Sequence, residues 1–303
     1  MKKAGTGRKI LGTLLALIFL SPFTVFAGGS SDSCNTQYPI VLAHGMGATT
    51  EILGIVDYWW GIEEALEDEG AEVYTTSVNA MDSTYNKAKD FDRQYCQILI
   101  ESGASKANII GHSHGTIYTR YAITNLGLAW EEKVASYTSL AGPHQGSSIA
   151  DLIMYNLDED LIDALGDSLD FVYSFVFGDD DPNSVQNGHD LCTDYMTQLF
   201  NPYTPNSPNV YYQSWAAKAK TSCPSVILEP TWLIMLVEEG ANDGLVGVES
   251  AKWGEFQGVE DAAWYSPGCD HLNMVGHLFG ITPGFDAPEF FVDIVSGLKN
   301  KGF

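Results

Sequence analysis

The chain has 303 residues, of which 45% are hydrophobic and 18% charged, and a formal net charge of −24. This composition is typical of a globular protein with one large core and excludes an intrinsically disordered chain. The excess of acidic groups argues against nucleic acid as a partner.

The first 27 residues have the pattern of a Sec-type signal peptide. Four basic residues precede an apolar run at 10–20, and the stretch Val25-Phe26-Ala27 ends before Gly28. The apolar run is short for a membrane span, so we expect cleavage near Ala27 and secretion through the periplasm. All five cysteines follow this segment, and an oxidising compartment would allow them to form disulfides.

Residues 28–303 are expected to form one domain whose first half alternates strand and helix patterns. Strands are expected at 38–43, 72–78, 107–110 and 134–140, and helices at 57–69, 86–102 and 113–126. This alternation predicts an α/β fold with a mostly parallel central sheet and helices on both faces.

The alternation stops after residue 149, where a helical cap or lid insertion is expected to span about 149–210. Apolar residues recur at helical spacing among Asp and Glu from 149 to 177, which indicates amphipathic helices. Residues 179–209 are rich in Asp, Asn and Pro and are expected to be loop-like. The remaining expected elements are sheet segments at 226–228 and 262–265 and a closing helix at 288–298.

The strongest motif is Gly111-His112-Ser113-His114-Gly115, a G-x-S-x-G sequence between an expected strand and an expected helix. This context is typical of a nucleophilic serine on a sharp turn at the end of a strand. Glycines two residues to either side let the strand and helix pass closely. We therefore predict Ser113 as the nucleophile of an α/β-hydrolase fold.

Backbone amides next to the nucleophile are expected to bind the negative charge that develops on a carbonyl oxygen. One is the amide of His114, and the other is that of Met46, which follows the first expected strand in His44-Gly45-Met46. A core methionine is the alternative for Met46. Its position between two glycines on a loop at a strand end argues against that alternative.

An acid and a histidine should follow the nucleophile in the chain. His271 follows the expected 262–265 segment by a short loop, whereas His144 comes too soon and His189 is expected at the surface. Asp243 lies in a Gly- and Asn-rich turn 28 residues before His271 and could orient its imidazole. Asp261 and Asp270 remain weaker alternatives, and Asp243 could equally be a turn-forming residue.

With these residues in place, the chain resembles the family I true lipases of Gram-negative bacteria. The similarity is dense between residues 38 and 152 and returns near residues 211, 241 and 271. The matching segments are YPIVLAHGM at 38–46, ILG at 52–54, DYW at 57–59, IIGHSHG at 109–115, GPHQGS at 142–147, 211–215, ANDGLVG at 241–247 and HLN at 271–273.

The resemblance implies a triad of Ser113, Asp243 and His271, a lid at 149–177, and a lipase-specific foldase as a partner during secretion. The chemistry needs no cofactor. The family binds a structural calcium, and the comparable positions here are Glu229, Asn273, His277 and the carbonyl of Ile281. Asn and His are poorer calcium ligands than carboxylates, so we do not expect the ion to be bound.

The family's disulfide has no counterpart, because Glu249 stands where its cysteine is expected. Two other disulfides are possible. Cys269 could pair with Cys223 and tether the His271 loop, and Cys34 could pair with Cys96.

These features predict a secreted serine carboxylester hydrolase that acts through an acyl-enzyme, most simply a triacylglycerol lipase working at an oil–water interface. The alternatives are an esterase, polyesterase or acyltransferase that uses the same triad. A catalytically inactive α/β-hydrolase that serves as a binding module is the remaining alternative.

Overall fold

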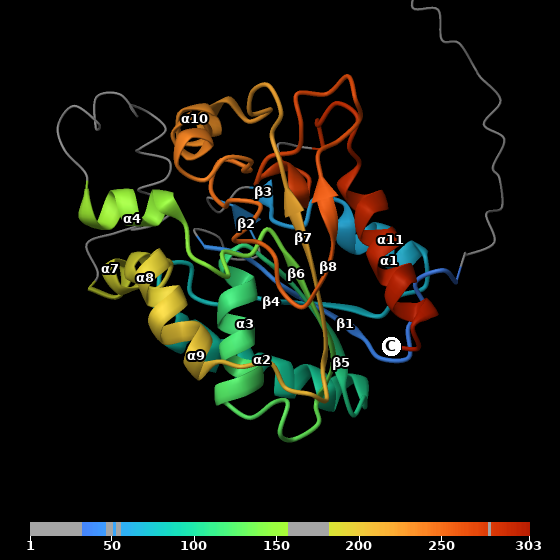
Figure 1. Cartoon of the computed structure of the whole chain (residues 1–303). Helices are drawn as coiled ribbons and strands as arrows, with labels where there is room; N and C mark the ends of the chain where they lie inside the picture. Colours follow the sequence, from blue (N-terminus) through green and yellow to red (C-terminus); the bar gives the residue numbers. More distant parts are fainter. Residues whose placement is uncertain (1–31, 47–50, 53–55, 157–181, 278–279) are drawn as a thin grey trace, which may run out of the picture.

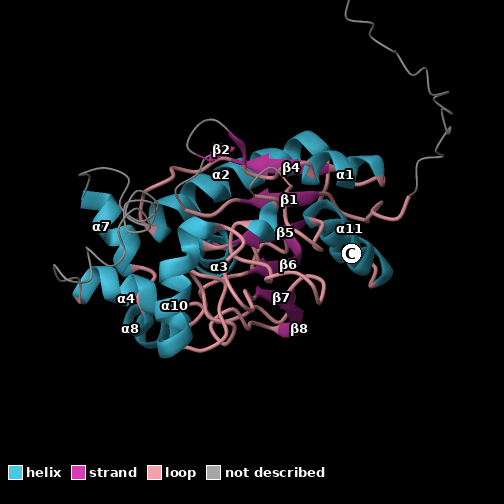
Figure 2. Cartoon of the chain, turned by 90° about the horizontal axis from the view of Figure 1, so that it is seen from above, coloured by secondary structure: helices cyan, strands magenta, loops and turns pink. Residues whose placement is uncertain are grey.

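A six-stranded, fully parallel sheet forms the centre of the protein (Figures 1 and 2). The computed structural model describes residues 32–46, 51–52, 56–156, 182–277 and 280–303, so the expected signal segment and most of 149–177 lie outside it. In spatial order the strands are β4 (Val73–Thr76), β1 (Ile40–Ala43), β5 (Ala107–His112), β6 (Val134–Leu140), β7 (Tyr211–Ala217) and β8 (Glu255–Glu260).

Alternate residues of the central strands face two hydrophobic cores. In β1, Ile40 and Leu42 pack in a core with helices α1 (Ile62–Asp68) and α11 (Ala287–Asn300). Val41 and Ala43 pack on the other face, in a core with α2 (Thr84–Ser102) and α3 (His114–Asn125). Both faces of the sheet are therefore covered, as Figure 2 shows, which explains the continuous apolar runs of its strands. The expected α/β fold is confirmed.

Helices also fill the chain between β6 and β7, in the part of the expected insertion that the structure describes. They are α4 (Ser148–Tyr155), α7 (Pro182–His189), α8 (Thr193–Tyr195), a π-helix (Met196–Phe200) and α9 (Asn201–Tyr203). The loop-like prediction for 179–209 was therefore wrong for 182–203, whereas 204–209 is a loop as expected. Cys192, Met196 and Phe200, four residues apart, are all buried in one apolar cluster, and this spacing was hidden by the polar residues around it.

The last part of the chain differs from the expectation at two places. Residues Val226–Leu228 form a 3-10 turn that leads into helix α10 (Glu229–Glu238), with a proline in the first turn of that helix. The last strand is β8 rather than 262–265, because Ala262 has a φ of 59° and residues 263–266 form a turn. A short antiparallel pair, β2 (Glu51–Ile52) and β3 (Val56–Asp57), and a 3-10 turn (Asn273–Val275) complete the described elements.

All five cysteines are free in the structure, so neither expected disulfide is present. Cys34 packs in the core beside α1 and α11, whereas Cys96 packs on the opposite face of the sheet, beside α2 and α3. Cys223 and Cys269 also belong to separate apolar clusters. Within the described residues, no helix is both long and apolar enough to span a bilayer.

Candidate functional site

Ser113 stands on a sharp turn between β5 and α3. Its backbone has φ 56° and ψ −131°, a strained conformation for a residue with a side chain, which costs on the order of 1–3 kcal/mol. A Cβ on Gly115 would lie 2.2 Å from the carbonyl oxygen of Ala43, and one on Gly111 would lie 3.0 Å from the backbone of Gly115. The two glycines therefore permit the close passage of β1, β5 and α3 that holds the serine on this turn at the strand end.

The loop after β1 lies against this turn. A Cβ on Gly45 would be 2.8 Å from Cβ of Ser113, so the loop and the serine are in contact. The amide of Gly45 donates to Oη of Tyr58 (2.9 Å), and that hydroxyl bonds to Nδ1 of His112 (2.5 Å). Tyr58 thus joins the loop to the residue before the serine, a contact that sequence reasoning did not identify.

Met46 follows Gly45 in this loop, and its side chain is buried in an apolar cluster with Ile117 and Ile149. The sequence argument against a core methionine was therefore wrong for the side chain, while the backbone amide remains on the loop beside Ser113. The other expected donor is the amide of His114. As the first residue of α3, it has no carbonyl partner within the helix.

Asp243 and His271 are hydrogen-bonded, with 2.8 Å between Oδ2 of the aspartate and Nδ1 of the histidine. The backbone amide of His271 also donates to the carbonyl of Asp243 (2.9 Å), and the second carboxylate oxygen accepts from the amides of Leu245 and Val246. Both side chains are buried. This arrangement fixes Nδ1 of His271 as the protonated nitrogen and leaves Nε2 able to accept a proton.

The Nε2 atom of His271 is buried and forms no hydrogen bond within the described part of the chain. The ring of His271 packs on that of His112, with 4.6 Å between centroids, so the pair lies beside the residue that precedes Ser113. Burial lowers the pKa of His112 well below its usual range, which keeps that neighbouring ring neutral. In structures without substrate, catalytic hydrogen bonds are often long, so an unused Nε2 is compatible with a general base.

Of the two alternative aspartates, Asp270 is buried and bound by the amides of Ser225, Leu272 and Asn273. Its carboxylate therefore shapes the loop that carries His271. Asp261 is half-exposed and forms a salt bridge to Lys218 at 3.2 Å. Neither carboxylate has the hydrogen bond to the imidazole that Asp243 makes.

The side chains at the positions that correspond to the family's calcium ligands form hydrogen bonds to other protein atoms. The carboxylate of Glu229 accepts from the amide of Cys223 (2.6 Å), and the side-chain amide of Asn273 donates to the carbonyl of His277 (2.5 Å). Nε2 of His277 contacts the carbonyl of Tyr58 at 3.1 Å. Ile281, the proposed carbonyl donor, is exposed. These hydrogen bonds link the His271 loop to its surroundings.

His144 has a structural environment. Its Nε2 bonds to the hydroxyl of Ser139 (2.7 Å), its Nδ1 lies 3.1 Å from Arg120, and its ring stacks on Trp253. His189 lies at the end of α7, where its ring contacts that of Tyr155. Neither histidine therefore competes with His271.

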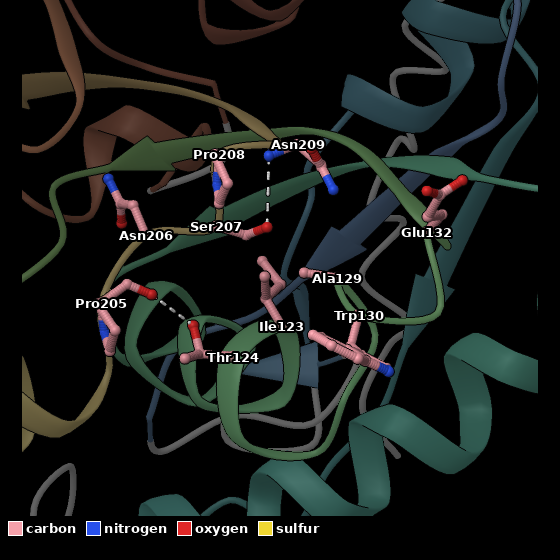
Figure 3. A pocket seen from close by; sticks show the side chains of 10 residues that line it. All are labelled: Ile123, Thr124, Ala129, Trp130, Glu132, Pro205, Asn206, Ser207, Pro208 and Asn209. Atoms are coloured by element: carbon pink, nitrogen blue, oxygen red, sulfur yellow. Dashed lines mark hydrogen bonds between the residues drawn. The ribbon is translucent and has the colours of Figure 1, made fainter.

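A surface hollow of about 480 Å³ lies at the far end of α3 from Ser113 (Figure 3). Ile123 and Ala129 lie at its apolar side, beside the exposed ring of Trp130, and the segment 205–209 forms the opposite wall. No histidine or cysteine lines it. This pocket therefore contains neither Ser113 nor His271.

The chain is similar to known lipases and thioesterases. The palmitoyl protein thioesterase family model matches residues 39–180. A triacylglycerol lipase of Vibrio cholerae is 30% identical over 91% of this chain and 94% of its own, and one of Pseudomonas fragi is 28% identical over 89% and 99%. The mature lipase of Bacillus licheniformis has a similar structure, with a TM-score of 0.63, 18% identity, and coverage of 85% of this chain and 91% of the other.

Proposed function

Because the chain belongs to the triacylglycerol lipases, an ester-hydrolysing family of the α/β-hydrolase fold, we propose that it hydrolyses lipid esters through an acyl-enzyme on Ser113. One observation carries this proposal. A buried Asp243–His271 pair has an unused Nε2 and packs on His112, the residue before a serine held on a strained, glycine-flanked turn. These are the parts that nucleophilic attack on a carbonyl requires.

In the proposed first step, Oγ of Ser113 attacks the ester carbonyl while Nε2 of His271 accepts its proton. Asp243 stabilises the imidazolium through Nδ1, and the amides of Met46 and His114 donate to the oxyanion. The intermediate collapses as His271 returns the proton to the departing alcohol, leaving the acyl group on Ser113. Water then attacks this acyl-enzyme by the same steps and releases the fatty acid.

The test of the nucleophile is Ser113→Ala, with exposed Ser105→Ala as the matched control. We expect Ser113→Ala to abolish p-nitrophenyl butyrate turnover and fluorophosphonate labelling, while the control keeps both. Retained turnover in pure Ser113→Ala would refute the assignment. Unlabelled wild-type protein would instead favour an inactive α/β-hydrolase that serves as a binding module.

The substrate class is tested by comparing an emulsified long-chain triacylglycerol with a soluble short-chain ester. A lipase is expected to gain rate above the solubility limit of its substrate, whereas an esterase, polyesterase or acyltransferase would show no such gain. The proposed partners are an ester-bearing lipid at an oil–water interface and, during export, a lipase-specific foldase. Refolding yield with and without a foldase from a related lipase operon tests the second partner.

Secretion is part of the same proposal and rests on the N-terminal pattern of residues 1–27. The mass of protein recovered from culture medium is expected to correspond to a chain that begins at Gly28. A chain that keeps its first 27 residues and stays with the cells would contradict secretion.

A further inference from the structure

Lys87 of α2 is fully buried, which is rare for lysine. Its Nζ contacts three acceptors: the carbonyl of Ala80 at 2.9 Å, Nδ1 of His114 at 3.2 Å and the side-chain oxygen of Asn187 at 3.2 Å. An ammonium has three N–H donors, so all three are used. One reaches the residue that follows Ser113, and another reaches α7 of the insertion.

When Lys87 is protonated, the direction of these hydrogen bonds follows from the ammonium, which can only donate. His114 must accept at Nδ1, so its proton lies on Nε2 and is donated to the hydroxyl of Thr84 (2.8 Å). The backbone amide of Thr84 donates to the carboxylate of Asp190 (2.7 Å). Hydrogen bonds thus run from the Lys87 ammonium through the ring of His114 to Thr84, whose backbone amide in turn binds a buried carboxylate.

The ring of His114 is therefore held from both sides, and its backbone amide is one of the two expected oxyanion donors. Asn187 and Asp190 belong to the insertion, whereas Thr84 and Lys87 belong to the first turns of α2. The network consequently fixes the start of α3 relative to two separate parts of the chain.

We propose that Lys87 is a positioning residue for ester hydrolysis, which through the ring of His114 sets the place of that residue's backbone amide beside the oxyanion. This inference rests on the proposed function. It assigns to Lys87 no contact with substrate.

The desolvation cost of burying Lys87 and Asp190 supports a positioning role, because buried charged groups of this kind add little to stability. Burial lowers the pKa of Lys87 to about 7 and raises the pKa of Asp190, so desolvation disfavours both charges. Charged groups facing Lys87 are Asp82 and Asp190, and the neighbouring histidines are His114 and His44. Buried charges of this kind contribute little net stability compared with apolar side chains of similar size.

The test is Lys87→Met, compared with Lys89→Met, which removes the same charge from an exposed position two residues further along α2. Turnover of p-nitrophenyl butyrate is measured per site that reacts with a fluorophosphonate, which excludes unfolded molecules from the count. We expect kcat of Lys87→Met to fall by about 10- to 100-fold with KM changed less than about threefold. The inhibition constant of a phenylboronic acid, which mimics the tetrahedral intermediate, should rise in parallel. Lys89→Met should match the wild type.

A kcat per labelled site within about twofold of the wild type would overturn the proposal. If Lys87→Met yields no folded protein, Thr84→Val decides, because it breaks the other support of the His114 ring. It should lower kcat by about 3- to 10-fold, and Thr84→Ser, which keeps the hydroxyl, should recover most of that loss. An unchanged kcat in Thr84→Val would also overturn the proposal. Wild-type protein that reacts with no fluorophosphonate would instead refute the proposed function.

Discussion

Replacement of Asp243 by asparagine tests how the carboxylate controls the imidazole. Its Oδ1 accepts from the amides of Leu245 (2.9 Å) and Val246 (2.7 Å), while Oδ2 faces Nδ1 of His271 (2.8 Å). In Asp243→Asn, the side-chain oxygen must remain toward the two amides, because an NH₂ group there would face two donors. The NH₂ group is therefore directed at Nδ1 of His271.

A donor in that position requires an unprotonated Nδ1, so the imidazole proton moves to Nε2. Nε2 can then no longer accept the proton of Ser113. We expect kcat to fall about 10⁴-fold, as for a triad with the wrong histidine tautomer, while KM changes little. The free energy of unfolding should decrease by about 1–2 kcal/mol, because a hydrogen bond between two neutral groups replaces a charge-assisted one.

The assay is initial-rate hydrolysis of p-nitrophenyl butyrate, with the folded fraction of each variant measured by circular dichroism. Asp261→Asn is the matched control, since Asp261 is half-exposed and paired with Lys218. We expect the control to keep wild-type kcat. The ¹⁵N chemical shifts of the His271 ring report the tautomer directly. Asp243→Asn protein that retains more than a tenth of wild-type kcat would refute this reasoning.

Three further outcomes follow from the same structure. Gly45→Ala places a Cβ 2.7 Å from the Tyr58 hydroxyl and 2.8 Å from Ser113 Cβ, so kcat should fall about 10- to 100-fold. Gly297→Ala, where a Cβ meets no atom within 4 Å, is its control; equal rates for the two variants would contradict the steric argument. Burial lowers the pKa of His44 to about 4, so the unfolded chain binds more protons than the folded protein between pH 6.5 and 4. The free energy of unfolding should therefore decrease by about 3 kcal/mol as the pH falls through that window. Urea midpoints that do not differ between pH 7 and pH 4 would argue against it. Prolonged treatment with EDTA should leave rate and melting temperature unchanged, because the side chains compared with calcium ligands already bond to protein atoms; a loss that calcium restores would show the opposite.

The elements around Ser113 could be predicted because local and tertiary requirements agree there. Strand β5 is a continuous buried run, and Gly111 and Gly115 are each required by a close backbone contact. The order of serine, aspartate and histidine limited the choice of His271, and Asp243 needed the family resemblance in addition. Its hydrogen bond to His271 joins the connection that precedes β8 to the loop that follows it, a contact between distant segments that the local pattern did not reveal.

Prediction failed where composition and packing disagree. The segment that holds α7, α8 and α9 is rich in Asp, Asn and Pro, yet Met196 and Phe200 lie on a buried face. Strand β8 alternates exposed and half-buried residues at the sheet edge, so it lacks the apolar run of a central strand. The cysteine pairs were chosen without knowing that the sheet separates Cys34 from Cys96.

The two expected oxyanion donors are supported by different parts of the molecule. Tyr58 joins the loop of Met46 to His112, whereas Lys87 and Thr84 of α2 hold the ring of His114 and also bond to the insertion. Because the two supports share no side chain, a change in one can move one donor and leave the other in place. The geometry of the proposed site therefore depends on the insertion through His114 and on the core beside α1 through Tyr58, so residues far from the ester can alter its turnover separately.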